Sequence, residues 1–91
     1  MITPTIHSNG TSARDLAEGY SNAARAVDAA IDAIAHSGPN GRDYYPQGPE
    51  AMTKAVEEHS TRLDSLRQIR TELEDLCVYC VDNEIKKASS H

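Results

Sequence analysis

The sequence predicts an all-α fold: an antiparallel helical hairpin with a longer second helix, which assembles into a homo-oligomeric helical bundle. Two long segments repeat apolar residues at spacings of three and four, the period of an amphipathic helix. A cluster of Gly and Pro residues separates the two segments. We expect helices at about 12–37 and 49–86, inside a hairpin domain of residues 12–87. A flexible segment of residues 1–11 should precede this domain, and a tail of residues 88–91 should follow it.

The first helix has sequence signals at both ends. Ser12, followed three residues later by Asp15, is typical of an N-terminal cap, because both side chains suit the free amide groups of a first turn. At the other end, Gly38 can adopt the left-handed conformation that ends a helix, and Pro39 cannot continue the hydrogen-bond ladder. Alanines dominate the sequence between these signals, so a neighbouring backbone can approach this helix closely.

The second helix begins as clearly. Gly48 can cap it, Pro49 suits the first helical position, and Glu50 complements the helix dipole. The expected apolar stripe consists of Met52, Val56, His59, Leu63, Leu66, Ile69, Leu73, Leu76, Cys80 and Ile85. Two pairs at helical spacing, Glu58 with Arg62 and Arg70 with Glu74, are expected to form ion pairs on the exposed side.

The two helices differ in length, at roughly 36 Å and roughly 57 Å for a rise of about 1.5 Å per residue. An antiparallel hairpin is therefore expected to leave the stretch from Leu76 to Ile85 partly uncovered, which would expose apolar side chains. Because two helices cannot enclose a core alone, we predict a homo-oligomer, most simply an antiparallel dimer. In an alternative arrangement, the second helix breaks near Asp82 and folds back.

Composition excludes several classes of function. The chain has 91 residues, enough for one domain, and 14 Asp and Glu against 9 Lys and Arg give a net charge of -5. Such a balance disfavours binding to long nucleic acids, and no stretch has the apolar length of a membrane span. We expect a cytoplasmic protein with no membrane partner. We expect Cys77 and Cys80 to be two reduced thiols on a packed helix that do not form a metal site. No catalytic motif is present, so we predict a non-enzymatic protein without a cofactor.

The linker GPNGRDYYPQG, residues 38–48, carries more chemistry than a connector requires. Asn40 and Gly41 suit a tight turn. Arg42 offers a planar fork of donors for phosphate or carboxylate, and Tyr44 and Tyr45 offer flat faces on which a purine can stack. These residues therefore suit a nucleotide-like anion. In the alternative interpretation, Arg42 pairs with Asp43 or Glu50 and the two Tyr rings plug the open end of the hairpin.

Two histidines have ordinary structural explanations beside any functional one. His59 lies in the apolar stripe, where a single His is usually a core residue that bonds to a neighbour. It also lies one turn from Arg62, so both side chains could line a ligand pocket that includes the linker. His36 ends the first helix, where the helix dipole favours a cation.

The chain resembles small phage and prophage proteins built as helical hairpins, the sponges that counter CBASS and Thoeris immunity. The resemblance rests on size, on two amphipathic helices, and on the segments PNGRDYYPQGPEA and EEHSTRLDSLRQIRTELEDL. It implies that the protein binds a cyclic oligonucleotide or a cyclic ADP-ribose isomer without cleaving it. Arg42 would then meet phosphate, and Tyr44 or Tyr45 would stack on a base. The full set of expected ligand-binding residues is Asn40, Arg42, Asp43, Tyr44, Tyr45, Gln47, His59 and Arg62.

A second hypothesis belongs to a different class of function. The chain could be a structural or protein-interaction module, a helical dimer that binds a partner helix through the surface from Leu73 to Ile85. The two hypotheses differ in the ligand, which is a small nucleotide-derived molecule in the first and a protein in the second.

Overall fold

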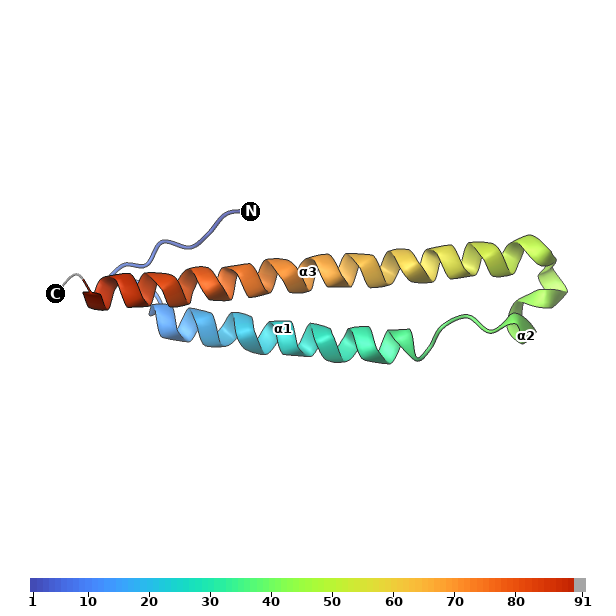
Figure 1. The fold of residues 1–91 in the computed structure, drawn as a ribbon, viewed down its shortest axis with the longest axis horizontal. Coiled ribbons are helices and arrows are strands. Elements are labelled where there is room, and N and C mark those ends of the chain that lie inside the picture. The colour runs from blue at the N-terminus through green and yellow to red at the C-terminus, as the bar shows by residue number, and fades with distance from the viewer. Residues whose placement is uncertain (90–91) are drawn as a thin grey trace.

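The structure is a computed structural model that describes residues 1–89, with side chains described through Glu84. The described residues fold into helices without strands, in the order α1 (Ala13–Ala35), α2 (Gly41–Tyr44), the short 3-10 helix η1 (Tyr45–Gln47) and α3 (Pro49–Ser89). Figure 1 shows that α1 and α3 lie side by side and run in opposite directions, with α2 at the far end of the linker. The predictions of an all-α fold and of a long second helix are confirmed.

Helix α1 begins as the sequence predicts and ends differently. The Asp15 amide donates to Ser12 Oγ at 3.1 Å, which confirms the cap. At the C-terminal end, the His36 amide donates to the Asp32 carbonyl, and Ser37 Oγ donates to the Ala33 carbonyl at 2.8 Å. Because these groups already bind the last carbonyls, a left-handed glycine is not needed. The prediction of a left-handed Gly38 is wrong, since within residues 1–89 positive φ occurs only at Gly48.

The linker is not the predicted tight turn at Asn40 and Gly41. Asn40 instead caps α2, with its Oδ1 accepting from the Arg42 amide at 3.0 Å, and Gly41 begins the helix. Helix η1 follows, and Gly48 then adopts a φ of 102°. The Gly48 carbonyl accepts from the Ala51 amide at 3.3 Å, so Gly48 and Pro49 start α3 as expected.

Helix α3 is continuous from Pro49 to Ser89 and extends past the predicted end at about residue 86. The alternative in which the chain breaks near Asp82 and folds back is therefore wrong. Ile85, the last expected member of the apolar stripe, lies outside the residues whose side chains are described. Within the described part of the chain, no helix has both the length and the hydropathy needed to cross a membrane.

Helix α1 lies against the C-terminal half of α3. Two contacts between the helices define this register: Arg14 Nε lies 4.0 Å from Glu84 Oε1, and Arg70 Nη1 lies 2.8 Å from Asp28 Oδ1. The C-terminal stretch is consequently covered in part, and Cys80 is fully buried. The expectation that the stretch after Leu76 is partly uncovered is confirmed for Val78 and Val81, which are 58% and 40% exposed. The first third of α3 is also uncovered by α1, because α1 ends at Ala35 and only the linker runs beside that part (Figure 1).

The hairpin core is thin. The buried apolar residues are Ala13, Ala17, Ala24, Ile31, Leu63 and Cys80. Most other members of the two apolar stripes are only partly buried, and Val56 and Ile69 keep 46% and 45% of their surface exposed. The chain measures 68 × 20 × 20 Å, an extended shape that leaves few positions out of contact with water. Two helices alone therefore bury only one narrow line of side chains.

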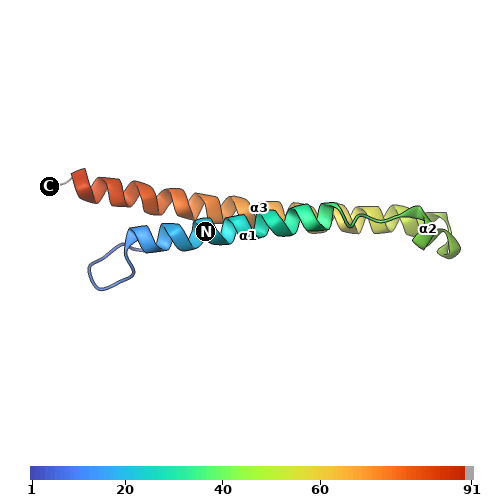
Figure 2. The ribbon, with the colours of Figure 1, turned by 90° about the horizontal axis from the view of Figure 1, so that it is seen from below.

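The N-terminal segment before α1 carries no helix. It turns back beside the C-terminal half of α3, with the Gly10 amide donating to the His7 carbonyl at 3.1 Å (Figures 1 and 2). The segment therefore lies beside the hairpin at the end opposite the linker.

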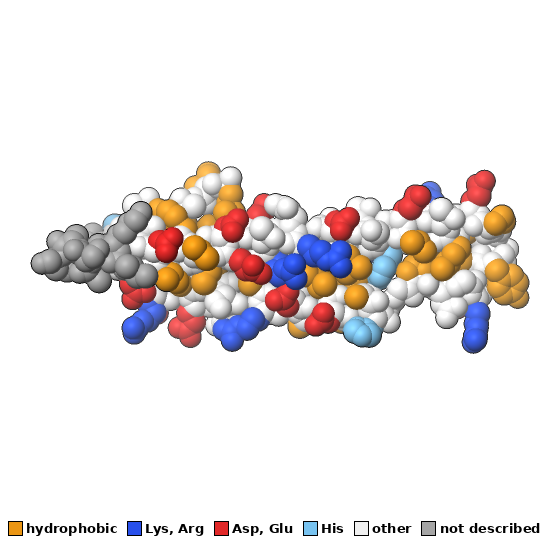
Figure 3. All heavy atoms as spheres, in the orientation of Figure 1, with side chains coloured by type: hydrophobic (Ala, Val, Ile, Leu, Met, Phe, Trp, Pro, Cys, Tyr) orange, Lys and Arg blue, Asp and Glu red, His pale blue; other side chains and the backbone are white. Residues whose placement is uncertain are grey.

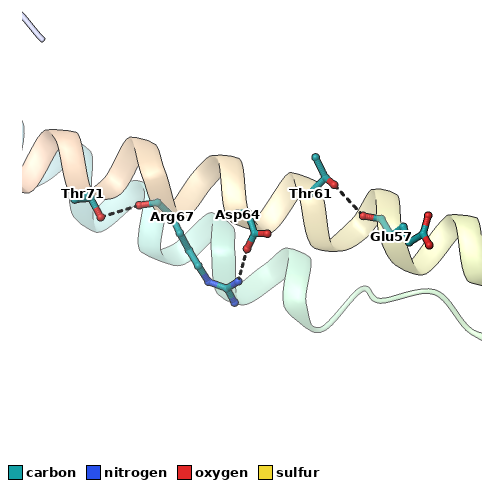
Figure 4. A network of polar contacts seen from close by, with 5 residues as sticks. All are labelled: Glu57, Thr61, Asp64, Arg67 and Thr71. Atoms are coloured by element: carbon teal, nitrogen blue, oxygen red, sulfur yellow. Dashed lines mark hydrogen bonds and ion pairs between the residues drawn. The ribbon is translucent and has the colours of Figure 1, made fainter.

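Polar side chains cover the outer side of α3. Thr61 and Thr71 donate to the carbonyls of Glu57 and Arg67, and Arg67 Nη1 lies 3.3 Å from Asp64 Oδ1 (Figure 4). One long face of the molecule also carries charged side chains of both signs along its middle (Figure 3).

Candidate functional site

A cleft of about 390 Å³ lies between the linker and the first third of α3, and we call it the linker cleft. The linker lines it with Ser37, Gly38, Pro39, Asn40, Asp43, Tyr44 and Gln47; α3 lines it with Ala51, Lys54, Ala55, Glu58, His59 and Arg62. The cleft exists because α1 ends at Ala35, opposite the middle of α3. From that point the linker covers α3 with irregular backbone and leaves room for a ligand.

The linker wall is shaped by the cap of α2. Because Asn40 Oδ1 accepts from the Arg42 amide, the chain begins a helical turn at Gly41. Asp43 and Tyr44 line the cleft from this turn, whereas Arg42 does not. The ring of Tyr44 is partly buried, and Tyr45 is 77% exposed and does not line the cleft. Only Tyr44 of the tyrosine pair therefore lines the cleft.

The α3 wall carries charges at helical spacing. Lys54, Glu58 and Arg62 follow one another at intervals of four residues, so they lie along one side of the helix. Arg62 Nη2 lies 3.6 Å from Glu58 Oε2, which confirms the predicted ion pair. Both side chains remain more than half exposed, so the pair is weak and a ligand can compete for Arg62.

His59 of α3 lies close to Gly38 of the linker. A methyl group at Gly38 would lie 3.6 Å from His59 Nε2, an ordinary contact distance. The side chain is partly buried, and no hydrogen bond joins its ring to another described residue. The expectation that His59 bonds to a core neighbour is therefore not met among the described residues, and both ring nitrogens can serve a ligand.

Six of the eight predicted ligand-binding residues meet in the linker cleft: Asn40, Asp43, Tyr44, Gln47, His59 and Arg62. Arg42 and Tyr45 lie outside it. Arg42 makes no ion pair with the described side chains, so the predicted pairing with Asp43 or Glu50 does not occur. A plug by both rings is likewise not formed, because Tyr45 is exposed.

Sequence reasoning missed Lys54 as a member of the site. Lys54 is the second cation of the cleft and lies two turns before Arg62 on the same side of α3. Counting back from Arg62 in steps of four residues would have found it. Its position matters because it gives the cleft a positive group at each end of this wall, with Glu58 between them.

The donor set of the cleft suits organic ions better than metals. Its ammonium and guanidinium groups bind phosphate or carboxylate, and the amides of Asn40 and Gln47 can both donate and accept. The carboxylates of Asp43 and Glu58 accept hydrogen bonds from amino or hydroxyl groups. Among the described residues, no cluster of three or more His, Cys, Asp or Glu is placed to hold a metal ion.

Comparisons of the chain with protein-family models, with curated proteins and with solved structures find no match. The assignment of a function therefore rests on the residues of the cleft and on their chemistry.

Proposed function

We propose that the protein binds a small nucleotide-derived anion in the linker cleft and sequesters it without cleaving it. The observation that carries this proposal is the meeting of six predicted ligand-binding residues with Lys54 in one cleft of about 390 Å³. The proposed biological role follows the resemblance to phage sponges: the ligand is an immune signal of the cyclic ADP-ribose or cyclic oligonucleotide type. The protein acts in the cytoplasm of the host cell as a homo-oligomer.

The two cations of the cleft fit a ligand with separated negative groups. Lys54 and Arg62 are eight residues apart in the sequence, so their backbones lie about 12 Å apart along α3 at about 1.5 Å per residue. Both side chains are long enough to shorten this span toward a ligand between them. A diphosphate or two phosphodiesters can therefore meet both cations, with Arg62 able to form the bidentate contact.

The remaining side chains fit the uncharged parts of a nucleotide. Tyr44 and His59 lie on opposite walls and can offer flat faces to a base. Asp43 and Glu58 can accept from ribose hydroxyls or from an exocyclic amino group. Their negative charges also oppose simple polyanions, so the lining favours a ligand that has both phosphates and hydrogen-bond donors.

The first experiment is a thermal-shift panel of cyclic ADP-ribose isomers, cyclic dinucleotides and cyclic trinucleotides against the full chain. Selective binding to the folded state raises Tm by mass action, so one class of compound should raise it and linear AMP should not. The bound compound should then be released by heat and identified by mass spectrometry. Recovery of the intact compound supports sequestration, whereas a hydrolysed product would make the protein an enzyme.

Matched variants locate the site by calorimetry. Arg62→Ala should weaken binding by about 1.5–3 kcal/mol, the worth of a charged hydrogen bond, and Lys54→Ala should weaken it similarly. Arg67→Ala is the control, because Arg67 is on the same helix and pairs with Asp64 outside the cleft. Arg42→Ala should have little effect. If Arg42→Ala abolished binding and Arg62→Ala did not, the ligand would lie on the outer side of the linker.

A protein-interaction module remains the alternative function. The observation that favours it is the exposure of Val78 and Val81, at 58% and 40%, on the C-terminal half of α3. A flat response to the whole panel, together with a defined protein retained by the wild type and lost with Val78→Glu, would support this alternative.

A further inference from the structure

We propose that a second copy of the chain covers one apolar side of the hairpin and completes a four-helix bundle. This side, called here the open face, is built by partly buried or exposed residues of both long helices: Leu16, Tyr20, Ala23, Val27, Ala30 and Ile34 of α1, and Leu66, Ile69, Leu73 and Leu76 of α3. The inference specifies the surface of the proposed homo-oligomer. It does not depend on the identity of the ligand in the linker cleft.

The uncharged part of the α1 surface is wider than the strip of α1 that α3 covers. Its charged residues are Arg14, Asp15, Glu18, Arg25, Asp28 and Asp32. At about 100° per residue, all of them fall within an arc of roughly 140°. The line buried against α3 runs through Ala17, Ala24 and Ile31. Most of the apolar residues of the open face lie beside this line, on the side away from the charged arc, so one apolar flank of α1 has no partner within the hairpin.

Helix α3 presents the matching half of the open face. Leu66, Ile69, Leu73 and Leu76 repeat at spacings of three and four residues and form one ridge. A shallow groove lined by Ser21, Ala24, Arg25, Asp28, Glu74, Cys77 and Val78 marks the opposite side of the helix pair, and it is this side that carries the charged residues Arg25, Asp28 and Glu74. The helical period therefore places this ridge and the uncharged flank of α1 on the same side of the hairpin. No charged residue between Leu63 and Val81 falls on the ridge.

The exposed surface area of the chain is consistent with a partner the size of a second copy. The chain exposes 6658 Å². A compact monomer of 9.9 kDa exposes about 5,200 Å² by the usual scaling with mass. The excess of roughly 1,500 Å² is within the range that each partner loses in a stable homodimer, about 1,000–2,500 Å². The extended hairpin therefore has enough excess surface for the dimer that we propose.

The open face is complementary to itself, which favours a second copy over an unrelated protein. Its α1 half carries the small residues Ala23 and Ala30, and its α3 half carries the large residues Ile69 and Leu76. In a two-fold dimer, α1 of one copy can pack on α3 of the other, so that small side chains meet large ones twice. All neighbouring helices are then antiparallel, as in an ordinary four-helix bundle. Each chain has a net charge of -5, but a dimer formed through the uncharged open face does not bring these like charges into contact.

The test is the mass of the full chain in solution, measured by sedimentation equilibrium. The wild type should have twice the mass of one chain. Ala30→Glu should shift the mass to that of one chain, because it places a charge on the open face. The matched control is Ala29→Glu, which changes the neighbouring exposed alanine on the charged side of the same helix and should leave the dimer intact. Ile69→Gln should weaken the dimer through the other half of the face.

Folding and ligand binding separate this inference from the proposed function. Circular dichroism should show similar helicity in the two alanine variants, and if Ala30→Glu unfolds, Ile69→Gln decides the question alone. A wild type at the mass of one chain throughout the concentration range would overturn the inference, as would variants of the open face that remain dimeric. Retention of a different protein on the open face would also overturn it. If the wild type dimerises but binds none of the compounds in the panel, the result would count against the proposed function alone.

Discussion

Arg70 of α3 donates a hydrogen bond from Nη1 to Oδ1 of Asp28 in α1 at 2.8 Å, and so joins the two long helices. Glu74 lies on the other side of the guanidinium, with Oε1 3.6 Å from Arg70 Nε. The hydrogen bond to Asp28 is the main cause that raises the pKa of Arg70 above its ordinary value. A raised pKa favours the charged form in the folded state. The resulting stabilisation is lost only as the pH rises beyond the ordinary pKa of arginine, so Arg70 stays charged at neutral pH.

The contact between Arg70 and Asp28 should stabilise the register of the hairpin. Arg70→Met should lower Tm more than Arg67→Met, because Arg67 pairs with Asp64 within one turn of the same helix and joins no second element. High salt should reduce the difference between the two variants, since screening weakens the wild-type ion pair. Thermal unfolding followed by circular dichroism measures both effects. Equal Tm values for the two variants would mean that the contact contributes nothing to the register.

Leu63 should be a sensitive position of the described core, in which it and Ile31 are the two large aliphatic side chains. It is buried opposite the end of α1, so Leu63→Ala removes packed methyl groups and should cost about 2–5 kcal/mol. Val78→Ala, on an exposed position of the same helix, should change stability by no more than about 0.5 kcal/mol. Urea unfolding at constant protein concentration gives both values. A small cost at Leu63 would show that the end of the hairpin is loosely packed.

Gly48 and Gly41 should respond oppositely to the same substitution. Gly48 has a φ of 102° and a ψ of 164°, a region that side chains rarely adopt, so Gly48→Ala should destabilise the chain by about 1–3 kcal/mol. Gly41 is helical with open space around it, so Gly41→Ala should stabilise by about 0.4–1 kcal/mol. Urea unfolding compares the two. Stabilisation by Gly48→Ala would contradict the described backbone at the start of α3.

The two cysteines should differ in reactivity. Cys80 is fully buried and Cys77 is partly exposed. Burial, and then the neighbouring Cys77, raise the pKa of the Cys80 thiol above its ordinary value. Iodoacetamide should therefore label Cys77 first and Cys80 only after unfolding, as peptide mass spectrometry can show. Rapid labelling of both thiols in the folded protein would contradict the burial of Cys80.

The raised pKa of the Cys80 thiol also predicts that the stability of the fold depends on pH. Because the pKa of the Cys80 thiol is higher in the folded state than in the unfolded state, its contribution to the free energy of unfolding is fully present below the unfolded pKa. This contribution is lost as the pH rises through the folded pKa. Stability should therefore fall as the pH rises above about 8.5, the ordinary pKa of a thiol, because the unfolded thiol then ionises more readily than the folded one. Cys80→Ala should remove this loss, and Cys77→Ala serves as the control. Urea unfolding at a series of alkaline pH values measures it.

Several parts of the candidate site could be predicted from residue chemistry. Asp43, Tyr44 and Gln47 stand out because a connector does not need them, and Arg62 stands out by its spacing from His59. Lys54 was missed because a single Lys in the first turns of a helix reads as a solvated residue. Arg42 does not line the cleft, because the cap by Asn40 sets the direction of each side chain in α2 and sequence does not show that direction.

The sequence by itself determined the two long helices, the residues that cap their N-terminal ends and the break between them, because local spacing and local hydrogen bonds carry that information. Only the tertiary structure decided where along α3 the shorter helix lies. The register depends on contacts between residues far apart in the chain, such as Asp28 with Arg70 and Arg14 with Glu84. That register leaves the first third of α3 to the linker and so creates the cleft. Local propensity cannot specify it, because it arises from packing and ion pairing between distant residues.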